Sequence, residues 1–152
     1  MHVVLYQPEI PSNTGNIART CAVTGTFLHL VRPLGFSTAD RYLKRAGLDY
    51  WPLVAVSYHD SLEELFAATA GSRFFFLTTR GKRPYHRVSY RPGDFLVFGR
   101  ETAGLPAALL AARPEECLRI PMAGGVRSLN LANAVALVLY EALRQMDFPG
   151  LV

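Results

Sequence analysis

The chain has 152 residues, half of them hydrophobic, which suits one compact domain (1–152) and leaves no low-complexity linker. Sixteen Lys and Arg residues against twelve Asp and Glu residues give a net charge of +4, which favours a polyanionic partner without establishing one. The chain shows no signal-peptide pattern and no run of about 18 apolar residues, so we expect a cytoplasmic protein without a membrane span.

Apolar, β-branched and aromatic runs predict the strands. Several of these runs lack the polar alternation of a half-exposed sheet, so most strands should be buried on both faces. The expected strands are 2–7, 27–32, 53–57, 73–79, 94–98 and 117–121.

Helical patterns alternate with these runs. Glycines 25, 47 and 71 are typical helix terminators, and Ser61 with Glu64 forms a capping box. The expected helices are 13–24, 37–46, 61–71, 106–112 and 131–146. This alternation predicts an α/β fold with a mostly parallel sheet, helices on both faces and ligands at the carboxyl ends of the strands.

Three segments combine glycine with polar residues: Asn13-Thr-Gly-Asn-Ile-Ala-Arg19, Phe98-Gly-Arg-Glu-Thr-Ala-Gly-Leu-Pro106 and the stretch 120–134. A Gly-Arg-Glu-Thr segment alone would be a weak signal, since such loops occur in many folds. Together and in this order, the segments resemble the three motifs of the SPOUT (SpoU-type) RNA 2′-O-methyltransferases. The resemblance covers nearly the whole chain.

The resemblance implies a deep trefoil knot in the last third of the chain, roughly 73–146. Nothing in periodicity or spacing indicates a knot, and the general rules of chain topology predict an unknotted protein.

The resemblance also implies S-adenosylmethionine as the cofactor. The chain has no Gly-x-Gly-x-x-Gly fingerprint, and the loop 99–104 lacks the Lys-Ser/Thr of a phosphate loop, which argues against a dinucleotide or a nucleoside triphosphate. Strand-end residues such as Leu77 and Ile120 would belong equally well to the core. The residues implied to bind the cofactor are Leu77, Thr78, Phe98, Gly99, Ile120, Met122, Ser128 and Leu129.

Matching the family motifs assigns the catalytic residues Asn13, Arg19, Glu101, Ser128 and Asn130. A guanidinium is a poor base at neutral pH, so we interpret Arg19 as a clamp on the phosphate beside the target ribose. The hydroxyl proton would then leave through Ser128 or water. Glu101 has an alternative role as the N-terminal cap of the helix near Leu105, and Asn130 could cap the long helix.

RNA contacts are less sharply indicated. Arg41, Lys44 and Arg45 share one face of an expected helix, and Arg127 stands next to Ser128. The segment 80–91 carries five cationic residues and no acid, which suits either phosphate contact or a solvated loop.

No metal site is expected, because the four histidines form no cluster with acidic residues. Cys21 and Cys117 lie in apolar surroundings without metal-ligand spacing, and both should be buried small hydrophobes.

The substrate implied by the resemblance is the wobble nucleotide of tRNA, cytidine or uridine 34, reached through contacts with the anticodon loop. Two alternatives stay open: the same chemistry on another tRNA or rRNA ribose, and a non-catalytic RNA-binding protein of the same fold.

A homodimer is expected from the last helix. Its apolar residues spread over an arc of roughly 200°, wider than the face that a surface helix needs for its own core. The surplus should bury against a second copy, which the resemblance also implies. The alternative is a central helix enclosed within one domain. The apolar residues are Leu131, Val135, Val138, Leu139, Ala142 and Leu143.

Overall fold

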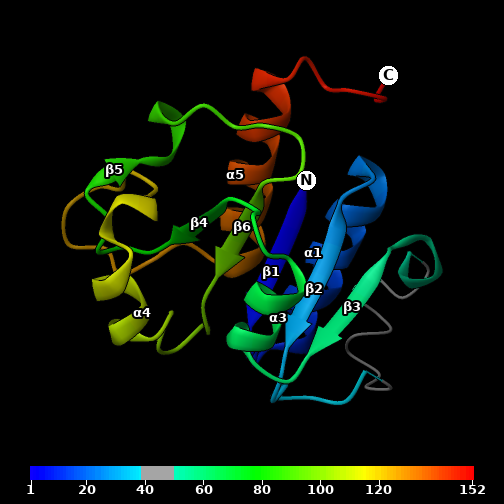
Figure 1. The fold of residues 1–152 in the computed structure, drawn as a ribbon, viewed down its shortest axis with the longest axis horizontal. Coiled ribbons are helices and arrows are strands. Elements are labelled where there is room, and N and C mark those ends of the chain that lie inside the picture. Colours follow the sequence, from blue (N-terminus) through cyan, green and yellow to red (C-terminus); the bar gives the residue numbers. More distant parts are fainter. Residues whose placement is uncertain (39–49) are drawn as a thin grey trace.

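The computed structural model of the protein describes residues 1–38 and 50–152 (Figure 1). Within these residues seven strands form one sheet in the order β3-β2-β1-β6-β4-β7-β5, and every neighbouring pair is parallel. The predicted α/β class with a parallel sheet is therefore confirmed. The strands are β1 (His2–Tyr6), β2 (Phe27–Val31), β3 (Val56–His59), β4 (Phe74–Leu77), β5 (Arg83–Pro84), β6 (Phe95–Phe98) and β7 (Cys117–Arg119).

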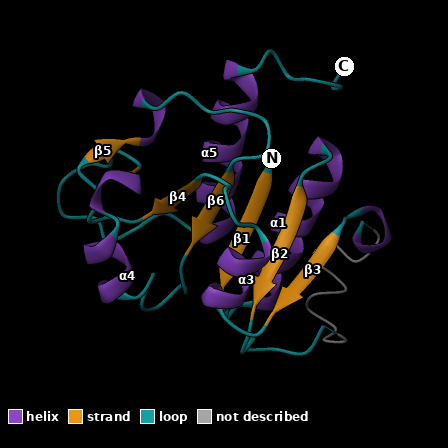
Figure 2. Cartoon of the chain, in the orientation of Figure 1, coloured by secondary structure: helices purple, strands orange, loops and turns teal. Residues whose placement is uncertain are grey.

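Helices cover both faces of the sheet (Figure 2). One face packs against α1 (Pro11–Thr24) and α5 (Leu131–Gln145), and the other against α3 (Leu62–Ala68) and α4 (Ala107–Ala112). Three short 3-10 helices complete the described elements: η1 (Trp51–Leu53), η2 (Tyr85–Arg87) and η3 (Pro114–Glu116).

The strands contribute side chains to both cores in turn. On β1, Val3 and Leu5 join the cluster beneath α1 and α5, while Val4 joins the cluster beneath α3. Successive side chains of a strand point to opposite faces, so a sheet covered on both faces needs apolar residues at every position. This is why the apolar runs show no polar alternation.

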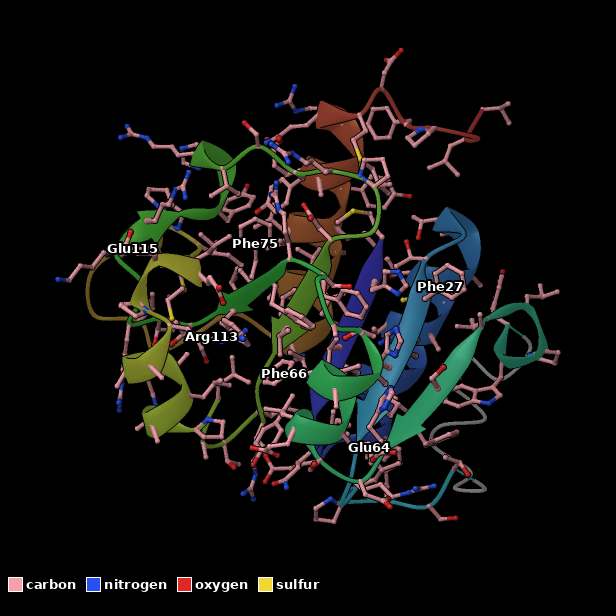
Figure 3. The ribbon with its side chains drawn as sticks, in the orientation of Figure 1. Phe27, Glu64, Phe66, Phe75, Arg113 and Glu115 are labelled. Carbon is pink, nitrogen blue, oxygen red and sulfur yellow. The ribbon has the colours of Figure 1, made fainter. Side chains whose placement is uncertain are left out.

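The core beneath α3 is aromatic. The Arg113 guanidinium, at the end of α4, lies 4.8 Å from the ring centre of Phe66 on α3 and 5.8 Å from that of Phe74 on β4 (Figure 3). A cation over these rings is attracted to their negative faces. The arginine thus connects α3 and α4 across the same face of the sheet.

The helix signals hold in part. The Ser61 hydroxyl accepts the Glu64 N–H at 3.1 Å, which confirms Ser61 as the cap of α3, but the Glu64 carboxylate reaches the N–H of Asp60 rather than that of Ser61. The same helix ends at Ala68, with Thr69 as its C-cap, and so before the expected Gly71. Gly25 follows α1 with φ +61°, a left-handed conformation that ends a helix at little cost for glycine.

Two strand predictions differ from the structure. The strand expected at 53–57 is shifted, because Leu53 belongs to the 3-10 helix η1, with Pro52 in its first turn, and β3 begins only at Val56. The two-residue β5 has no counterpart among the expected strands. It contains Pro84, which lacks an N–H and is tolerated at the edge of the sheet where β5 lies. The helix expected at 37–46 falls almost entirely outside the described residues, and so do Arg41, Lys44 and Arg45.

The dimer surface predicted on α5 consists of the wrong residues. Five of the six are at most 3% exposed and pack within this chain, as the enclosed-helix alternative holds, and Leu131 is partly buried against the same core. The five are Val135, Val138, Leu139, Ala142 and Leu143. The arc is wide because α5 packs against both the sheet and the neighbouring helix α1. The apolar side chains that α5 does expose are Leu137 (40%) and Tyr140 (44%).

Cys21 and Cys117 are buried and unpaired, as expected, and burial raises the pKa of the Cys21 thiol to about 12. No helix in 1–38 or 50–152 has both the length and the apolar character needed to cross a bilayer.

Candidate functional site

A pocket of about 1000 Å³ opens where β4, β6 and β7 end and α5 begins. Parallel strands bring their carboxyl ends to one edge of the sheet, and this is the edge where ligands of α/β proteins bind. The loops that follow these three strands form most of the pocket wall, and the loop before α1 completes it.

Most of the residues predicted for the site line this single pocket. They include all eight expected to bind the cofactor: Leu77, Thr78, Phe98, Gly99, Ile120, Met122, Ser128 and Leu129. Among the residues predicted to be catalytic, Asn13, Glu101, Ser128 and Asn130 line it as well, and so does Arg127. The pocket thus combines segments that are more than 100 residues apart in the chain.

Backbone groups are available along one wall. Residues 121–129 lie outside the described helices and strands, and apart from the turn at Gly124 and Gly125 their N–H and C=O groups take part in no described backbone–backbone hydrogen bond. Main-chain groups that protein does not satisfy need water or a ligand as partner. Leu77, Ile120 and Met122 are half-buried beside them and present apolar surface to the pocket.

The loop after β6 closes tightly on itself. Arg100 and Gly104 exchange two backbone hydrogen bonds, of 3.2 and 2.9 Å. A Cβ at Gly99 would stand 2.2 Å from the carbonyl carbon of Gly104, so any side chain at this position forces the backbone to move. Gly104 has φ +69°, which also favours glycine.

Glu101 holds the turn before α1. Its carboxylate accepts the N–H of Glu9 at 2.8 Å and the N–H of Ile10 at 3.1 Å. Ile10 is the residue before α1, and its side chain cannot cap the helix. The Glu101 carboxylate, which belongs to the loop after β6, instead lies at the positive amino end of α1. Glu101 was expected, as one alternative, to cap the helix near Leu105. It lies at the start of α1 instead, and the expectation that it holds a loop is confirmed.

Glu9 makes the reciprocal contacts. Its carboxylate accepts the Thr102 N–H at 3.0 Å, the Thr102 hydroxyl and the Arg100 guanidinium at 3.1 Å. The backbone N–H of Thr102, helped by its hydroxyl and by Arg100, lowers the pKa of the Glu9 carboxyl. The sequence reasoning missed Glu9. The available signal was an acidic residue just after β1, at the edge of the sheet where the other site residues lie.

Asn13 connects Glu101 to the start of α5. The Asn13 amide nitrogen donates to Glu101 at 3.3 Å, and the Asn13 oxygen accepts from the Asn130 amide nitrogen at 2.9 Å. The Asn130 oxygen accepts the N–H groups of Ala132 and Asn133, so Asn130 caps α5 as expected. Three of the predicted catalytic residues therefore form one hydrogen-bonded chain.

Arg19 does not line the pocket of its own chain. It is exposed on α1, and its guanidinium lies 4.7 Å from the centre of the Tyr50 ring. Asn13 and Arg19 are six positions apart, which corresponds to about 240° around a helix, so they point in different directions. The catalytic role of Arg19 remains a prediction.

The histidines lie elsewhere on the sheet. His29 contacts His2 through its Nε2 and His59 through its Nδ1, each at an N–N distance of 3.0 Å, so three histidines form a row across β1, β2 and β3. Burial lowers the pKa of His2 and of His29 to about 4. Among the residues that the structure describes, no group of three or more His, Cys, Asp or Glu side chains is arranged to hold a metal ion.

Comparison with known proteins places this site in a family. Residues 1–140 match the SpoU rRNA Methylase family. A protein of Bacillus subtilis (strain 168) is 60% identical over 154 residues, which covers 99% of this chain and 96% of that protein. The tRNA (cytidine(34)-2′-O)-methyltransferase of Escherichia coli (strain K12) is 51% identical over 153 residues, which covers 100% of this chain and 98% of that enzyme.

Solved structures agree with this assignment. A structure described as giving insights into the 2-OH methylation of C/U34 on tRNA has a TM-score of 0.91 at 52% identity, covering 96% of this chain and 95% of that one. The SpoU methyltransferase AviRb from Streptomyces viridochromogenes, in complex with AdoMet, has a TM-score of 0.82 at 27% identity, covering 97% of this chain and 58% of that one. The match over residues 1–140, together with full-length identities above 50%, means that this chain belongs to the SpoU rRNA Methylase family.

Proposed function

We propose that the protein is an S-adenosylmethionine-dependent tRNA 2′-O-methyltransferase that modifies the wobble nucleotide, cytidine or uridine 34. The observation that carries this proposal is the single pocket that gathers Asn13, Glu101, Ser128 and Asn130 with the cofactor-binding residues implied by the family motifs. The full-length identity with the Escherichia coli wobble methyltransferase supports the choice of substrate.

The pocket fits S-adenosylmethionine by its chemistry. Its volume of about 1000 Å³ lies at the upper end of the range for small-molecule sites, which leaves room for a ribose beside the cofactor. The free main-chain groups of 121–129 suit the polar edge of an adenine, and Leu77, Ile120 and Met122 suit its faces. The AdoMet complex of AviRb supports the same cofactor for this chain.

The residues around the pocket have two tasks, to place the ribose hydroxyl and to remove its proton. The bound cofactor supplies an already activated methyl group. Hydrogen bonds from Asn13 to Glu101 and from Asn130 to Asn13 hold the loops around Ser128 in a fixed arrangement. In-line attack of the ribose hydroxyl on the methyl group requires such a preorganised site. The hydroxyl proton leaves to water, either directly or by way of Ser128, which passes its own proton on to water as it takes the new one, and Arg19 binds the phosphate beside the target ribose.

A homodimer is part of the proposal. Exposed side chains at intervals of three and four residues form one stripe on α1, which includes Arg19 and Val23, and another on α5, which includes Leu137 and Tyr140. Both helices lie on the same face of the sheet. A second copy that covers these stripes would bury the apolar side chains and place Arg19 at the subunit boundary.

The remaining proposals concern the whole chain. We propose one domain over 1–152, a cytoplasmic location and a trefoil knot within roughly 73–146. The knot rests on the family resemblance. The segment between β4 and β6 does lie against α5: the Gln145 side chain, at the end of α5, accepts the Tyr90 N–H at 3.0 Å, and α5 also contacts η2.

Methyl transfer to a defined tRNA tests the function. Purified protein should methylate a tRNA transcript with cytidine or uridine at position 34, and mass spectrometry should place the methyl group on that ribose. A matched transcript with a 2′-deoxy residue at position 34 should accept none. Transfer to another ribose would indicate the first alternative, and RNA binding without transfer would indicate the second.

A further inference from the structure

A second, smaller cleft adjoins the large pocket. It has a volume of about 240 Å³ and lies between the turn that follows β4 and the helix α4. Thr78, Arg80 and Leu110 line both hollows, so the two adjoin. The cleft is smaller than a typical small-molecule site, but it can accommodate a single charged group.

Two cations border this cleft. Arg80 and Lys82 are exposed, and neither takes part in an ion pair within the described part of the chain. They belong to the segment 80–91, which carries five cationic residues and no acid. An unpaired, exposed arginine and lysine beside a cleft are suited to bind an anionic group.

The backbone between these two cations is held firmly. Thr78 accepts the Arg80 N–H through its hydroxyl and the Gly81 N–H through its carbonyl, each at 3.2 Å. A Cβ at Gly81 would lie 2.6 Å from the Leu118 carbonyl carbon, so this turn presses directly against β7. After Lys82 the chain enters β5, which pairs with β7, so the backbone on both sides of Lys82 is fixed to β7. The two cations therefore start from a rigid backbone at the pocket rim.

No acidic side chain in the described part of the chain pairs with the two cations of this rim. Glu115 (labelled in Figure 3) and Glu116 belong to η3, and neither lines the pocket or the cleft. Glu116 also pairs with Arg113 at 3.2 Å. Glu101 lines the pocket, and its carboxylate already accepts the N–H groups of Glu9 and Ile10. On the other wall of the pocket, Arg127 adds a third exposed cation.

We infer that Arg80 and Lys82 form a phosphate-binding site for the RNA backbone next to the nucleotide whose ribose enters the large pocket. This inference rests on the proposed function. Because the two hollows adjoin, one RNA strand that places a ribose in the pocket would bring a neighbouring phosphodiester to the cleft. RNA phosphate matches the charge of the rim and the size of the cleft.

Salt-dependent tRNA binding tests the inference. Arg80→Ala and Lys82→Ala should each lower the slope of log K against log salt by about one unit and weaken binding about tenfold near 0.1 M salt. Calorimetry should find their affinity for S-adenosylmethionine unchanged. Arg80→Lys keeps the charge and should retain the wild-type slope. The matched control is Arg91→Ala, which removes an exposed cation of the same segment on the far side of η2, before the amino end of β6.

The outcomes separate this site from the proposed function. If the wild type methylates tRNA while Arg80→Ala and Lys82→Ala bind it as tightly as Arg91→Ala, with the same slope, the phosphate site is overturned and the function stands. Loss of cofactor affinity in Arg80→Ala would also overturn it, since the residue would then serve the cofactor. A wild type that transfers no methyl group to tRNA would instead overturn the proposed function.

Discussion

At the scale of single residues, the site depends on two carboxylates that cross between neighbouring loops. Glu101 binds backbone N–H groups in the turn before α1, and Glu9 in that turn binds Thr102 and Arg100 beside Glu101. The family motif identified Glu101, but its partners are about 90 residues away in the sequence and could not be read from it. Each carboxylate therefore acts as part of a pair that joins two walls of the pocket.

Replacing Glu9 should loosen one of these walls. Glu9→Gln puts an amide where Thr102 and Arg100 need an ionised acceptor, so we expect severalfold weaker binding of S-adenosylmethionine, measured by calorimetry, and a lower melting temperature. Glu115→Gln removes an exposed carboxylate outside the pocket and should change neither. Wild-type cofactor affinity in Glu9→Gln would show that the loop does not need this carboxylate.

Arg19 should affect transfer without affecting the cofactor. Because it lies outside the pocket of its own chain, Arg19→Ala should bind S-adenosylmethionine normally. If it binds the phosphate beside the target ribose, methyl transfer should fall roughly a hundredfold or more. Single-turnover transfer and calorimetry measure the two effects. A folded variant that no longer binds the cofactor would contradict the role assigned to Arg19.

At the scale of elements, the loops at the carboxyl edge of the sheet are shaped by close backbone contacts. The sequence indicated a glycine-bearing loop after β6, but only the structure shows that Gly99 touches the backbone of Gly104. The row of histidines is a similar case. His2, His29 and His59 are distant in the sequence, and strand pairing alone brings them together.

Gly99→Ala should disrupt the loop after β6. The added methyl group meets backbone rather than a flexible side chain, so we expect a loss of about 1–3 kcal/mol in the free energy of unfolding and much weaker cofactor binding. Gly124→Ala is the matched control, because a Cβ there meets nothing within 4 Å. Equal denaturation midpoints for the two variants would argue against a tight loop.

The histidine row should make stability depend on pH. Burial lowers the pKa of His29 from 6.5 to about 4, so below pH 6.5 the unfolded chain binds more protons than the folded one. The contribution of neutral His29 to the free energy of unfolding is therefore complete above about pH 6.5 and is lost as the pH falls towards 4. Denaturant unfolding between pH 7 and pH 4 should show a flatter decline for His29→Asn than for the wild type. If the stabilities of His29→Asn and of the wild type decline in parallel, His29 does not cause the pH dependence of stability.

At the scale of the whole molecule, the question is which surface a second copy would cover. Leu139 and Leu143 are buried in the core of one chain, so lysine at either position should unfold the protein rather than separate subunits. The exposed stripes of α1 and α5 are the surfaces that remain, and their apolar side chains are the ones to change.

Leu137→Lys combined with Tyr140→Lys should convert a dimer into a folded monomer with little tRNA methylation. Both side chains are at least 40% exposed, so the fold of the chain should tolerate the change. Leu53→Lys, at a position 71% exposed on η1, is the control and should remain a dimer. Analytical ultracentrifugation decides, and a wild type that sediments as a monomer at micromolar concentration would rule out the dimer.

The sequence by itself determined the α/β class and most strands and helix ends, because these depend on local periodicity and capping. The resemblance of its contiguous motifs to a family implied many of the residues that line the pocket. The tertiary structure alone decided the pairing of Glu9 with Thr102, the position of Arg19 outside the pocket, the burial of one side of α5 and the cleft beside Arg80. These features arise where segments distant in the chain meet across a parallel sheet. Local propensities carry no information about that meeting, since it depends on strand order and on the packing of helices over each face.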